Sequence, residues 1–195
     1  MSGTSLTDPF GRRIEYVRVS VTDRCDLRCN YCMPKGFRDF EEPGDWLTFD
    51  ELERVTAAFA RLGTRRIRLT GGEPLVRRDL PVLARRLSVL PGVEDISLST
   101  NATRLARAAV ELRDAGIRRI NVSLDSLRPE VFREITGGKL ERVLGGLMAA
   151  KDAGFHPIKI NMVVMAGVNE DEVENMVRFC LEHGFTLRFI ETMPM

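Results

Sequence analysis

The sequence predicts an α/β fold, a partial (β/α)6 TIM-like barrel. Two observations support this prediction. Short apolar runs rich in β-branched residues alternate with longer segments of helical period, which is typical of parallel strands joined by right-handed crossovers. Polar residues also recur at a spacing of two along one strand after another, so we expect one polar and one apolar face on the sheet.

Six strands and the helices between them are expected from this alternation. The strands are expected near 16–21, 66–70, 95–99, 118–123, 157–164 and 186–191. The helices are expected near 49–62, 79–90, 103–115, 129–135 with 141–153, and 170–183. No low-complexity segment or linker interrupts 12–191, so we expect a single core domain over 1–195 with an N-terminal extension at 1–12.

Capping residues agree with several of these helix ends. Thr48 with Glu51, and Asn169 with Glu172, match the side-chain and backbone exchange of a capping box at a helix start. Glycines stand where four helices are expected to stop, namely Gly63, Gly116, Gly154 and Gly184.

The polar residues of the strands favour a partial barrel over a flat, doubly wound sheet. A sheet that is covered on both faces has near-continuous apolar strands. Here the strands carry polar pairs at Arg18/Ser20, Arg68/Thr70, Ser97/Ser99, Asn121/Ser123 and Lys159/Asn161, with Arg188 in the last strand. We therefore expect an open polar interior that holds a ligand.

Composition excludes several functional classes. The 29 basic and 28 acidic residues give a net charge of +1, so no bulk field attracts nucleic acid or an acidic membrane. The longest apolar run, 162–168, is too short to span a bilayer. Residues 1–8 lack the apolar region of a secretory signal, so a cytoplasmic location is expected.

Three cysteines are the strongest chemical signal. Cys25, Cys29 and Cys32 have the spacing C-x3-C-x2-C, and three thiolates on one loop can bind three irons of a [4Fe–4S] cluster. A structural zinc site needs a fourth ligand, and no second ligand pair is present. Disulfides are disfavoured in a reducing compartment. Spacing alone leaves the zinc and metal-free alternatives open.

A second motif follows the strand at 66–70. Leu69-Thr70-Gly71-Gly72-Glu73-Pro74 places two glycines where the backbone can approach a ligand closely, and Glu73 offers a carboxylate to an ammonium group. A lone Gly-Gly turn would be ordinary loop chemistry.

Together the two motifs resemble those of the radical S-adenosylmethionine (SAM) enzymes, because Tyr31 supplies the aromatic residue before the last cysteine. The resemblance implies a partial barrel of the radical SAM type and a cluster whose open iron binds SAM. It also implies that reduction of the cluster cleaves SAM to a 5′-deoxyadenosyl radical, which abstracts hydrogen from a substrate. The Gly-Gly-Glu-Pro element resembles the one that binds the SAM amino group in these enzymes.

The interior cations indicate the substrate. Arg18, Arg68, Lys159 and Arg188 are all expected to face inward. Buried charges are costly unless they are paired, and arginine grips phosphate with paired hydrogen bonds, so a di- or triphosphate is the expected complement. Internal pairing with Asp and Glu from loops is the alternative.

Further segments resemble the GTP 3′,8-cyclase family of molybdenum cofactor biosynthesis, within the radical SAM enzymes. They are Leu6 to Arg12, Tyr16 to Cys25, Arg68 to Arg77, Asn121 to Leu127, Ile135 to Gly137 and Leu187 to Glu191. The resemblance implies a lyase that converts GTP to (8S)-3′,8-cyclo-7,8-dihydroguanosine 5′-triphosphate. It implies cluster binding by Cys25, Cys29 and Cys32, SAM contacts from Tyr31, Gly72, Ser123 and Met193, and GTP contacts from Arg18, Arg68, Ser99 and Lys159. It assigns no protein residue as the catalytic group.

The chain departs from this family in two places. The family continues into a segment with three more cysteines that hold a second cluster, so we expect this chain to be the N-terminal core, either as a fragment or as a shortened paralogue. Cys180 lies in the apolar stripe Val173, Met176, Val177, Cys180 and Leu181, and is expected to be a core thiol. Ala102 stands where the family has glycine, and a positive φ there would strain it.

Other functions and partners remain open at this stage. Another radical SAM enzyme that modifies peptide or tRNA, and a non-catalytic iron–sulfur or zinc module, are the alternatives to the cyclase. The resemblance implies an electron donor such as flavodoxin or ferredoxin, and a homodimer is an open alternative to a monomer.

Overall fold

The computed structural model describes residues 6–33, 36–41 and 43–191. Its strands form one parallel sheet with the order β1-β2-β3-β4-β5-β6, which confirms the α/β prediction. The strands are β1 (Tyr16–Ser20), β2 (Arg66–Thr70), β3 (Asp95–Thr100), β4 (Ile117–Ser123), β5 (Ile158–Val164) and β6 (Thr186–Glu191). Within the described residues β1 and β6 do not pair, so the barrel is partial.

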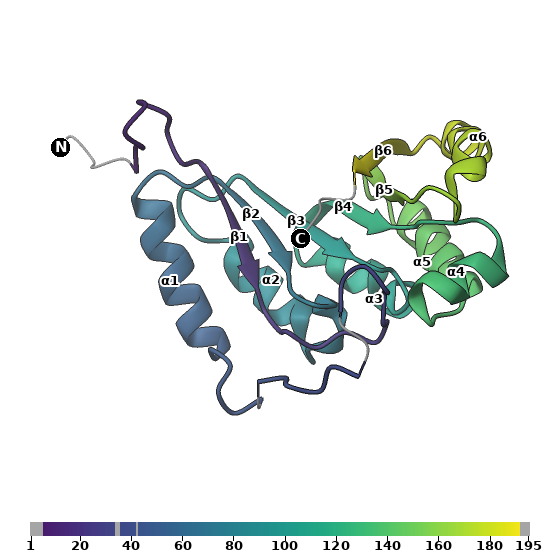
Figure 1. Ribbon diagram of the computed structural model, residues 1–195. Coiled ribbons are helices and arrows are strands. Elements are labelled where there is room, and N and C mark those ends of the chain that lie inside the picture. The colour runs from purple at the N-terminus through teal and green to yellow at the C-terminus, as the bar shows by residue number, and fades with distance from the viewer. Residues whose placement is uncertain (1–5, 34–35, 42, 192–195) are drawn as a thin grey trace.

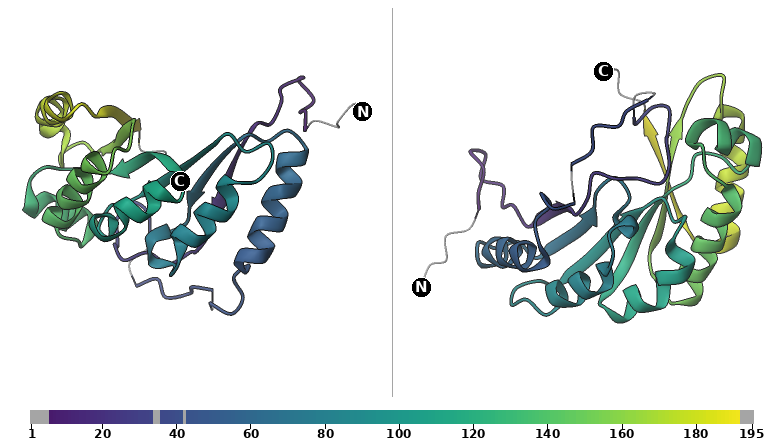
Figure 2. Two further views of the ribbon diagram at one scale, coloured as in Figure 1. Left: turned by 180° about the vertical axis from the view of Figure 1, so that it is seen from behind. Right: turned by 90° about the horizontal axis from the view of Figure 1, so that it is seen from below.

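The helices follow the convex side of the curved sheet, as the right-hand view of Figure 2 shows. In chain order they are α1 (Phe49–Arg61), the 3-10 turn η1 (Pro74–Val76), α2 (Leu80–Ser88), α3 (Leu105–Asp114), α4 (Pro129–Thr136), α5 (Leu140–Asp152), the 3-10 turn η2 (Glu170–Glu172) and α6 (Val173–His183). Figure 1 shows how each helix returns the chain to the start of the next strand. Two helices, α4 and α5, connect β4 to β5.

The core lies between the helices and the apolar face of the sheet. The strand residues at its centre are at most 1% exposed, and they are Ile67, Leu69, Leu98, Ile120, Val122 and Ile160. Helix residues Leu83, Leu112 and Leu147 pack in the same apolar cluster. Full burial of each such side chain stabilises the fold by about 1.5–3 kcal/mol. The helices therefore cover the face of the sheet that carries these residues.

The opposite face is polar, as the sequence predicted. In the register of the sheet, Arg18 stands beside Arg68, and Arg68 stands beside Ser97. Asn121 pairs with Lys159, and Asn161 pairs with Arg188. The polar residues therefore form rows across the inside of the curve.

One member of this face, Arg119, was missed by the sequence analysis. A register shift at Ile96/Ser97 aligns Arg119 with Ser97, and β4 begins at Ile117, one residue before the expected start. Its guanidinium Nε donates to Asp95 Oδ1 at 3.0 Å. The spacing of two from Arg119 to Asn121 and Ser123 was the signal that could have found it.

The capping prediction is confirmed at one helix and wrong at the other. Glu51 N donates to Thr48 Oγ1 at 3.3 Å, and Thr48 N donates to the Glu51 carboxylate at 2.8 Å. Asn169 makes no side-chain cap. Its amide instead bonds Met165 N, Asp125 O and Val163 O, because it is buried between the ends of β4 and β5 and has backbone groups there to satisfy.

Helix α6 confirms the prediction for Cys180 but only part of the predicted stripe. Met176 and Cys180 are buried in the core, and burial raises the pKa of the Cys180 thiol to about 11. Val177 and Leu181 are exposed, at 37% and 76%. Because α6 packs beside the last strand of the sheet, it has fewer neighbours to cover its apolar side.

Candidate functional site

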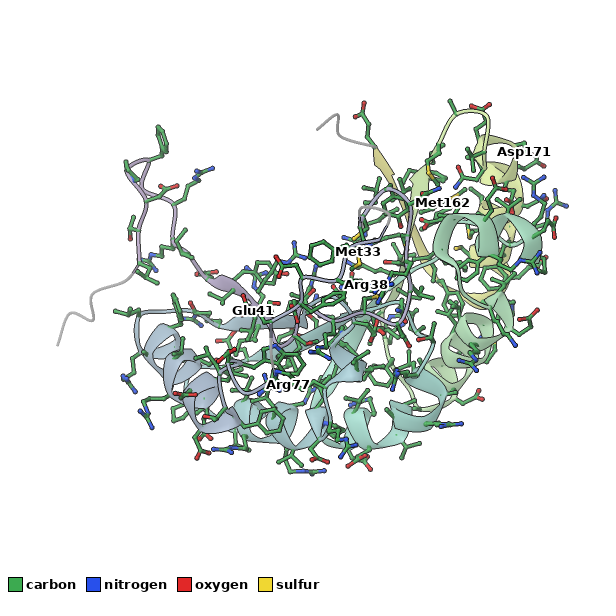
Figure 3. All side chains as sticks on the ribbon, turned by 60° about the horizontal axis from the view of Figure 1, so that its bottom comes forward. Met33, Arg38, Glu41, Arg77, Met162 and Asp171 are labelled. Carbon is green, nitrogen blue, oxygen red and sulfur yellow. The ribbon has the colours of Figure 1, made fainter. Side chains whose placement is uncertain are left out.

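The segment between β1 and α1 carries the three cysteines and lies inside the curve of the sheet. Figure 3 labels Met33, Arg38 and Glu41 on this segment. Arg77, which follows η1, connects the start and the end of this segment: its guanidinium donates to Val21 O at 2.8 Å and to Leu47 O at 2.5 Å. It also lies over the rings of Trp46 and Phe49, at 5.6 and 4.7 Å. Such a cation–π contact adds to its hydrogen bonds.

Cys25, Cys29 and Cys32 line one pocket of about 280 Å³ at the carboxyl ends of the strands. Burial raises the pKa of the Cys29 thiol to about 12, and the nearby Asp125 carboxylate adds to this shift. Burial also raises the pKa of Cys25. Without a metal these thiols stay protonated, and a bound metal deprotonates its thiol ligands.

The two glycines serve the protein's own backbone. A Cβ on Gly72 would lie 2.5 Å from the carbonyl oxygens of Asp23 and Arg24, and one on Gly71 would collide with Thr22 O. The turn instead bonds the cysteine segment directly, from Gly72 N to Thr22 O and from Glu73 N to Arg24 O, both at 2.8 Å. Their bare Cα atoms therefore allow the turn after β2 to pack against the start of the cysteine loop. Both glycines also line the cysteine pocket, so the expected close approach of a ligand to Gly72 stays a prediction.

Glu73 does not offer its carboxylate to the pocket, contrary to the sequence-based expectation. It is fully buried and accepts from Thr100 Oγ1 at 2.7 Å, Asn101 N at 2.6 Å and Leu75 N at 3.0 Å. Burial raises the pKa of Glu73 to about 7, against the effect of these hydrogen bonds. Its role is to join the turn after β2 to the end of β3.

Tyr31 is tied to the opposite side of the pocket. Its hydroxyl donates to Asp125 Oδ2 at 2.7 Å, and Asp125 Oδ1 accepts from Val163 N at 2.8 Å. Burial raises the pKa of Tyr31, and it raises the pKa of Asp125 despite these two donors. This chain of contacts fixes the aromatic residue of the cysteine loop to the ends of β4 and β5.

Most of the sequence-predicted site residues share this pocket. Besides the cysteines, its lining includes Arg18, Tyr31, Gly72, Ser99 and Ser123. Arg68 and Lys159 lie on the same polar face of the sheet, outside the pocket lining. Met193 lies outside the described residues.

The four inward cations have no carboxylate partner within residues 6–33, 36–41 and 43–191. None of the ion pairs there includes Arg18, Arg68, Lys159 or Arg188. Arg68 lies over the Tyr16 ring at 5.3 Å, and Arg188 donates to Asn121 Oδ1 at 2.6 Å. The carboxylates of the described loops therefore do not pair with these cations, contrary to the sequence-based alternative.

The electrostatics of this face favour an anion. Burial lowers the pKa of the Arg68 guanidinium, and the positive charges of Arg188, Arg18 and Arg119 lower it further, although Tyr16 opposes them. Arg188 Nε and Asn161 Oδ1 are buried without a hydrogen-bond partner in the described part of the chain. Unsatisfied buried polar atoms are costly, so this face is suited to a polar, multiply charged ligand.

The donor set fits an iron–sulfur cluster. Among the described residues, no three His, Cys, Asp or Glu side chains meet as ligands of a single metal ion. In a [4Fe–4S] cluster each cysteine binds a different iron. The thiols therefore need to line the same pocket, but they do not need to converge on a single metal position. The three cysteines meet that requirement.

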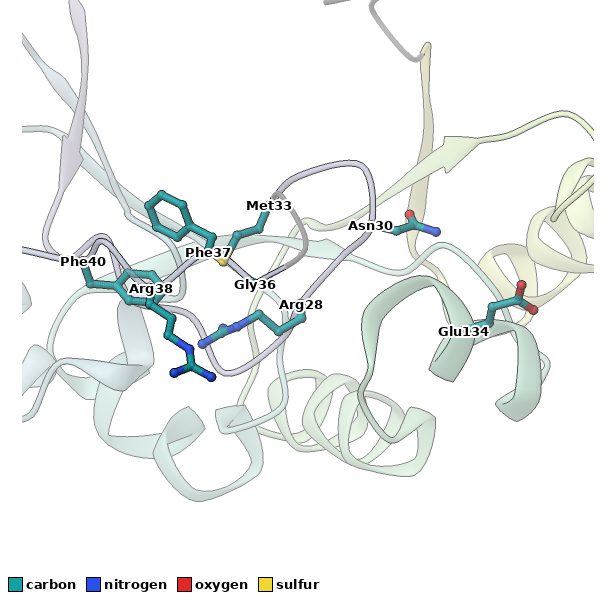
Figure 4. A pocket seen from close by; sticks show the side chains of 8 residues that line it. All are labelled: Arg28, Asn30, Met33, Gly36, Phe37, Arg38, Phe40 and Glu134. Carbon is teal, nitrogen blue, oxygen red and sulfur yellow. The ribbon is translucent and has the colours of Figure 1, made fainter.

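A second cavity, of about 630 Å³, is lined mainly by residues of the segment between β1 and α1. Figure 4 shows Phe37 beside Met33 there, with the guanidinium groups of Arg28 and Arg38 close to each other. Glu134 of α4 supplies a carboxylate at its edge. This cavity shares no lining residue with the cysteine pocket.

The fold and the cysteine pocket define a radical SAM protein. A sequence profile of the radical SAM superfamily matches residues 19–180, so this chain belongs to that superfamily. Its members use a [4Fe–4S] cluster and SAM.

Curated relatives are similar to this chain over almost its whole length. The chain is 53% identical over 192 residues to the GTP 3′,8-cyclase of Hydrogenovibrio crunogenus and 50% identical over 190 residues to that of Geobacter sulfurreducens.

These alignments cover 97% of this chain and 58% of each relative, so the chain spans little more than half of their length. Solved structures show the same fold. SuiB of Streptococcus suis has a TM-score of 0.77 at 19% identity, covering 92% of this chain and 39% of that one. Methylornithine synthase (PylB) has a TM-score of 0.73 at 15% identity, covering 92% and 53%.

None of the helices formed by the described residues has both the length and the apolar character needed to cross a membrane.

Proposed function

We propose that this chain is the radical SAM core of a GTP 3′,8-cyclase, which converts GTP to (8S)-3′,8-cyclo-7,8-dihydroguanosine 5′-triphosphate in molybdenum cofactor biosynthesis. The observation that carries the proposal is the continuity of two features on one polar face. The cysteine pocket lies at the ends of the strands, and the unpaired cations lie along the same strands. The names of the curated relatives support GTP as the substrate.

The cofactor residues follow from the pocket lining. Cys25, Cys29 and Cys32 would bind three irons and leave the fourth for SAM, with Tyr31, Gly72, Ser123 and Met193 as the further SAM contacts. When bound and reduced, the cluster and SAM supply a 5′-deoxyadenosyl radical. The protein's part is to keep the cysteine loop in place through Tyr31 and the Gly71–Gly72 turn, and to exclude water from the pocket.

The interior cations would hold the triphosphate. Arg18, Arg68 and Lys159 lie on three strands of the polar face. Arg188 Nε and Asn161 Oδ1 add two buried polar atoms that have no hydrogen-bond partner among the described residues. Arginine binds phosphate oxygens in pairs, while lysine acts as a point charge. Ser99 would add a hydroxyl between the phosphate region and the cysteine pocket.

The proposal also includes an electron donor, a single domain and a cytoplasmic location. An electron donor such as flavodoxin or ferredoxin would reduce the cluster, and the cavity lined by Met33, Phe37 and Arg38 shares no lining residue with the cysteine pocket. We propose that residues 1–195 form one domain, because all six strands belong to one sheet. A cytoplasmic location suits free thiols. Dimerisation is left to measurement.

Binding of GTP to the reconstituted protein tests the proposal. Titration calorimetry under anaerobic conditions should show GTP bound at least tenfold more tightly than guanosine. Lys159→Gln should weaken GTP binding about tenfold, or about 1.4 kcal/mol, because it removes one phosphate contact. Arg118→Gln is the matched control, since Arg118 is an exposed cation of the neighbouring strand.

Equal affinity for GTP and guanosine would contradict the proposal, as would equal losses in the two variants. Preference for a peptide or an RNA would favour another radical SAM enzyme. One zinc and no iron per chain would favour a non-catalytic module.

A further inference from the structure

Asn101 reaches the cysteine loop from the end of β3. It directly follows the strand and is buried, with 9% of its surface exposed. Its side-chain Nδ2 lies 3.7 Å from Cys25 Sγ, within hydrogen-bond range for sulfur, and 2.9 Å from Asp26 Oδ1. No sequence motif assigned a role to this residue.

The neighbouring groups fix the orientation of the Asn101 amide. Its Oδ1 accepts from Thr103 N at 3.0 Å and from Thr103 Oγ1 at 2.8 Å. A flipped amide would place its NH₂ group against the Thr103 N–H donor and its oxygen against the Asp26 carboxylate. The amide hydrogens must therefore face Asp26 and the Cys25 sulfur.

This contact belongs to a firmly held corner of the loop. Asp26 also accepts from Arg104 Nε at 3.0 Å, and the single hydroxyl hydrogen of Thr103 is shared between Asp26 Oδ2 and Asn101 Oδ1, each 2.8 Å from Thr103 Oγ1. The backbone N–H of Asn101 donates to Glu73, and that of Leu27 donates to Cys25 Sγ at 3.4 Å. Cys25 Sγ thus has two N–H donors: the backbone of Leu27 in its own loop and the side chain of Asn101 directly after β3.

We infer that Asn101 is a positioning residue that raises the reduction potential of the cluster through its N–H···S bond to Cys25. This inference rests on the proposed cluster at Cys25, Cys29 and Cys32. Reduction adds negative charge that the ligand sulfurs share, and an N–H donor stabilises that charge. Hydrogen bonds to the sulfurs are one of the determinants of iron–sulfur potentials.

Two substitutions remove the donor in different ways. Asn101→Ser keeps an oxygen that can accept from Thr103 N–H in the same turn, but its side chain is too short to reach the sulfur. Asn101→Leu keeps the approximate size and has no donor. Thr103→Val is the matched control, because it removes a hydroxyl from the same network and leaves the amide-to-sulfur contact in place.

Anaerobic redox titration, followed by the paramagnetic signal of the reduced cluster, tests the inference. At a fixed solution potential, both Asn101 variants should show about a tenfold lower ratio of reduced to oxidised cluster. That ratio corresponds to a midpoint about 59 mV more negative for a one-electron couple. Thr103→Val should match the wild type.

An unchanged midpoint in an Asn101 variant with full iron content would overturn the inference, and so would an equal shift in Thr103→Val. Loss of the cluster from both Asn101 variants, with the cluster kept in Thr103→Val, would also overturn it, because Asn101 would then act in binding rather than in potential. A wild-type protein without a cluster would instead refute the proposed function.

Discussion

The two regions of the polar face differ in how their charges are satisfied. At the carboxyl ends of the strands the buried carboxylates have several donors each: Glu73 joins β2 to β3, Asp125 holds Tyr31, and Glu172 accepts from Ser126. Along the strands, the cations Arg18, Arg68, Lys159 and Arg188 have no carboxylate partner in the described part of the chain.

The difference distinguishes a region whose charged groups are satisfied by the protein, at the strand ends, from one whose charged groups would be satisfied by a ligand, along the strands. Because the buried carboxylates Glu73 and Asp125 already have donors within the protein, they hold the cysteine loop before any cofactor binds, which is the preorganisation that a catalytic centre needs. Within the described residues these cations have no carboxylate partner, so a bound anion would supply one.

The largest effect is expected at the cluster cysteines. Cys29→Ala should abolish the iron–sulfur absorbance and SAM binding of the reconstituted protein, while its circular dichroism stays that of the wild type, because the sheet is formed by other residues. Cys180→Ala is the control, since this thiol packs in the core. It should keep the iron and lower only the free energy of unfolding. Iron retained in Cys29→Ala would refute the assignment.

A large loss of stability is expected at the bonded strand ends. Glu172 is 2% exposed and accepts from Ser126 Oγ at 2.6 Å and Leu127 N at 2.8 Å. Glu172→Ala leaves these buried donors unpaired, so urea unfolding should show a loss of about 3 kcal/mol. Glu174→Ala removes only an exposed pair with Arg178 and should cost at most about 0.5 kcal/mol. Comparable losses in the two variants would contradict the account.

Substitution of an interior cation should leave stability almost unchanged. Arg68→Gln loses a contact with the Tyr16 ring and a long hydrogen bond to Ser97 Oγ (3.4 Å), but it relieves repulsion from Arg18 and Arg188, so the free energy of unfolding should stay within about 1 kcal/mol of the wild type. Inorganic triphosphate should raise the melting temperature of the wild type more than that of Arg68→Gln, since a ligand stabilises the state that binds it. A loss as large as that of Glu172→Ala would show that Arg68 already has an internal partner.

The smallest effect is expected at Ala102, where φ is 61°. Ala102→Gly relieves about 1 kcal/mol of left-handed strain and loses a buried methyl group that contributes about 0.8 kcal/mol. The net change in the free energy of unfolding should be below about 1 kcal/mol. Ala84→Gly, in the helical and equally buried α2, should cost about 2 kcal/mol. Equal costs would mean that Ala102 is not strained.

Periodicity predicted the part of the fold that depends on alternation along single strands. The inward placement of Arg68, Asn121 and Lys159 needed only the spacing of two, because a strand turns successive side chains to opposite faces. The strain at Ala102 was also foreseen, from the family's glycine at that position.

Contacts between distant segments were beyond the reach of local patterns. Asn169 and Glu172 match a capping box, yet both bond the end of β4, more than forty residues away in sequence. The sequence motif indicated that Glu73 binds an ammonium group, but its carboxylate accepts a hydrogen bond from Thr100 and so connects the turn after β2 to the end of β3. The pairing of Arg119 with Ser97 depends on a register shift between β3 and β4, which no single-strand pattern reveals, although the spacing of two placed Arg119 on the polar face.

The central claim is that three cysteines hold a cluster with one iron open to SAM. Electron paramagnetic resonance of the anaerobically reconstituted, reduced protein tests it most directly. We predict a [4Fe–4S] signal that changes when SAM is added and does not form in Cys29→Ala. A signal that SAM leaves unaltered, as a fourth protein ligand would produce, or a protein that binds only zinc, would contradict the account.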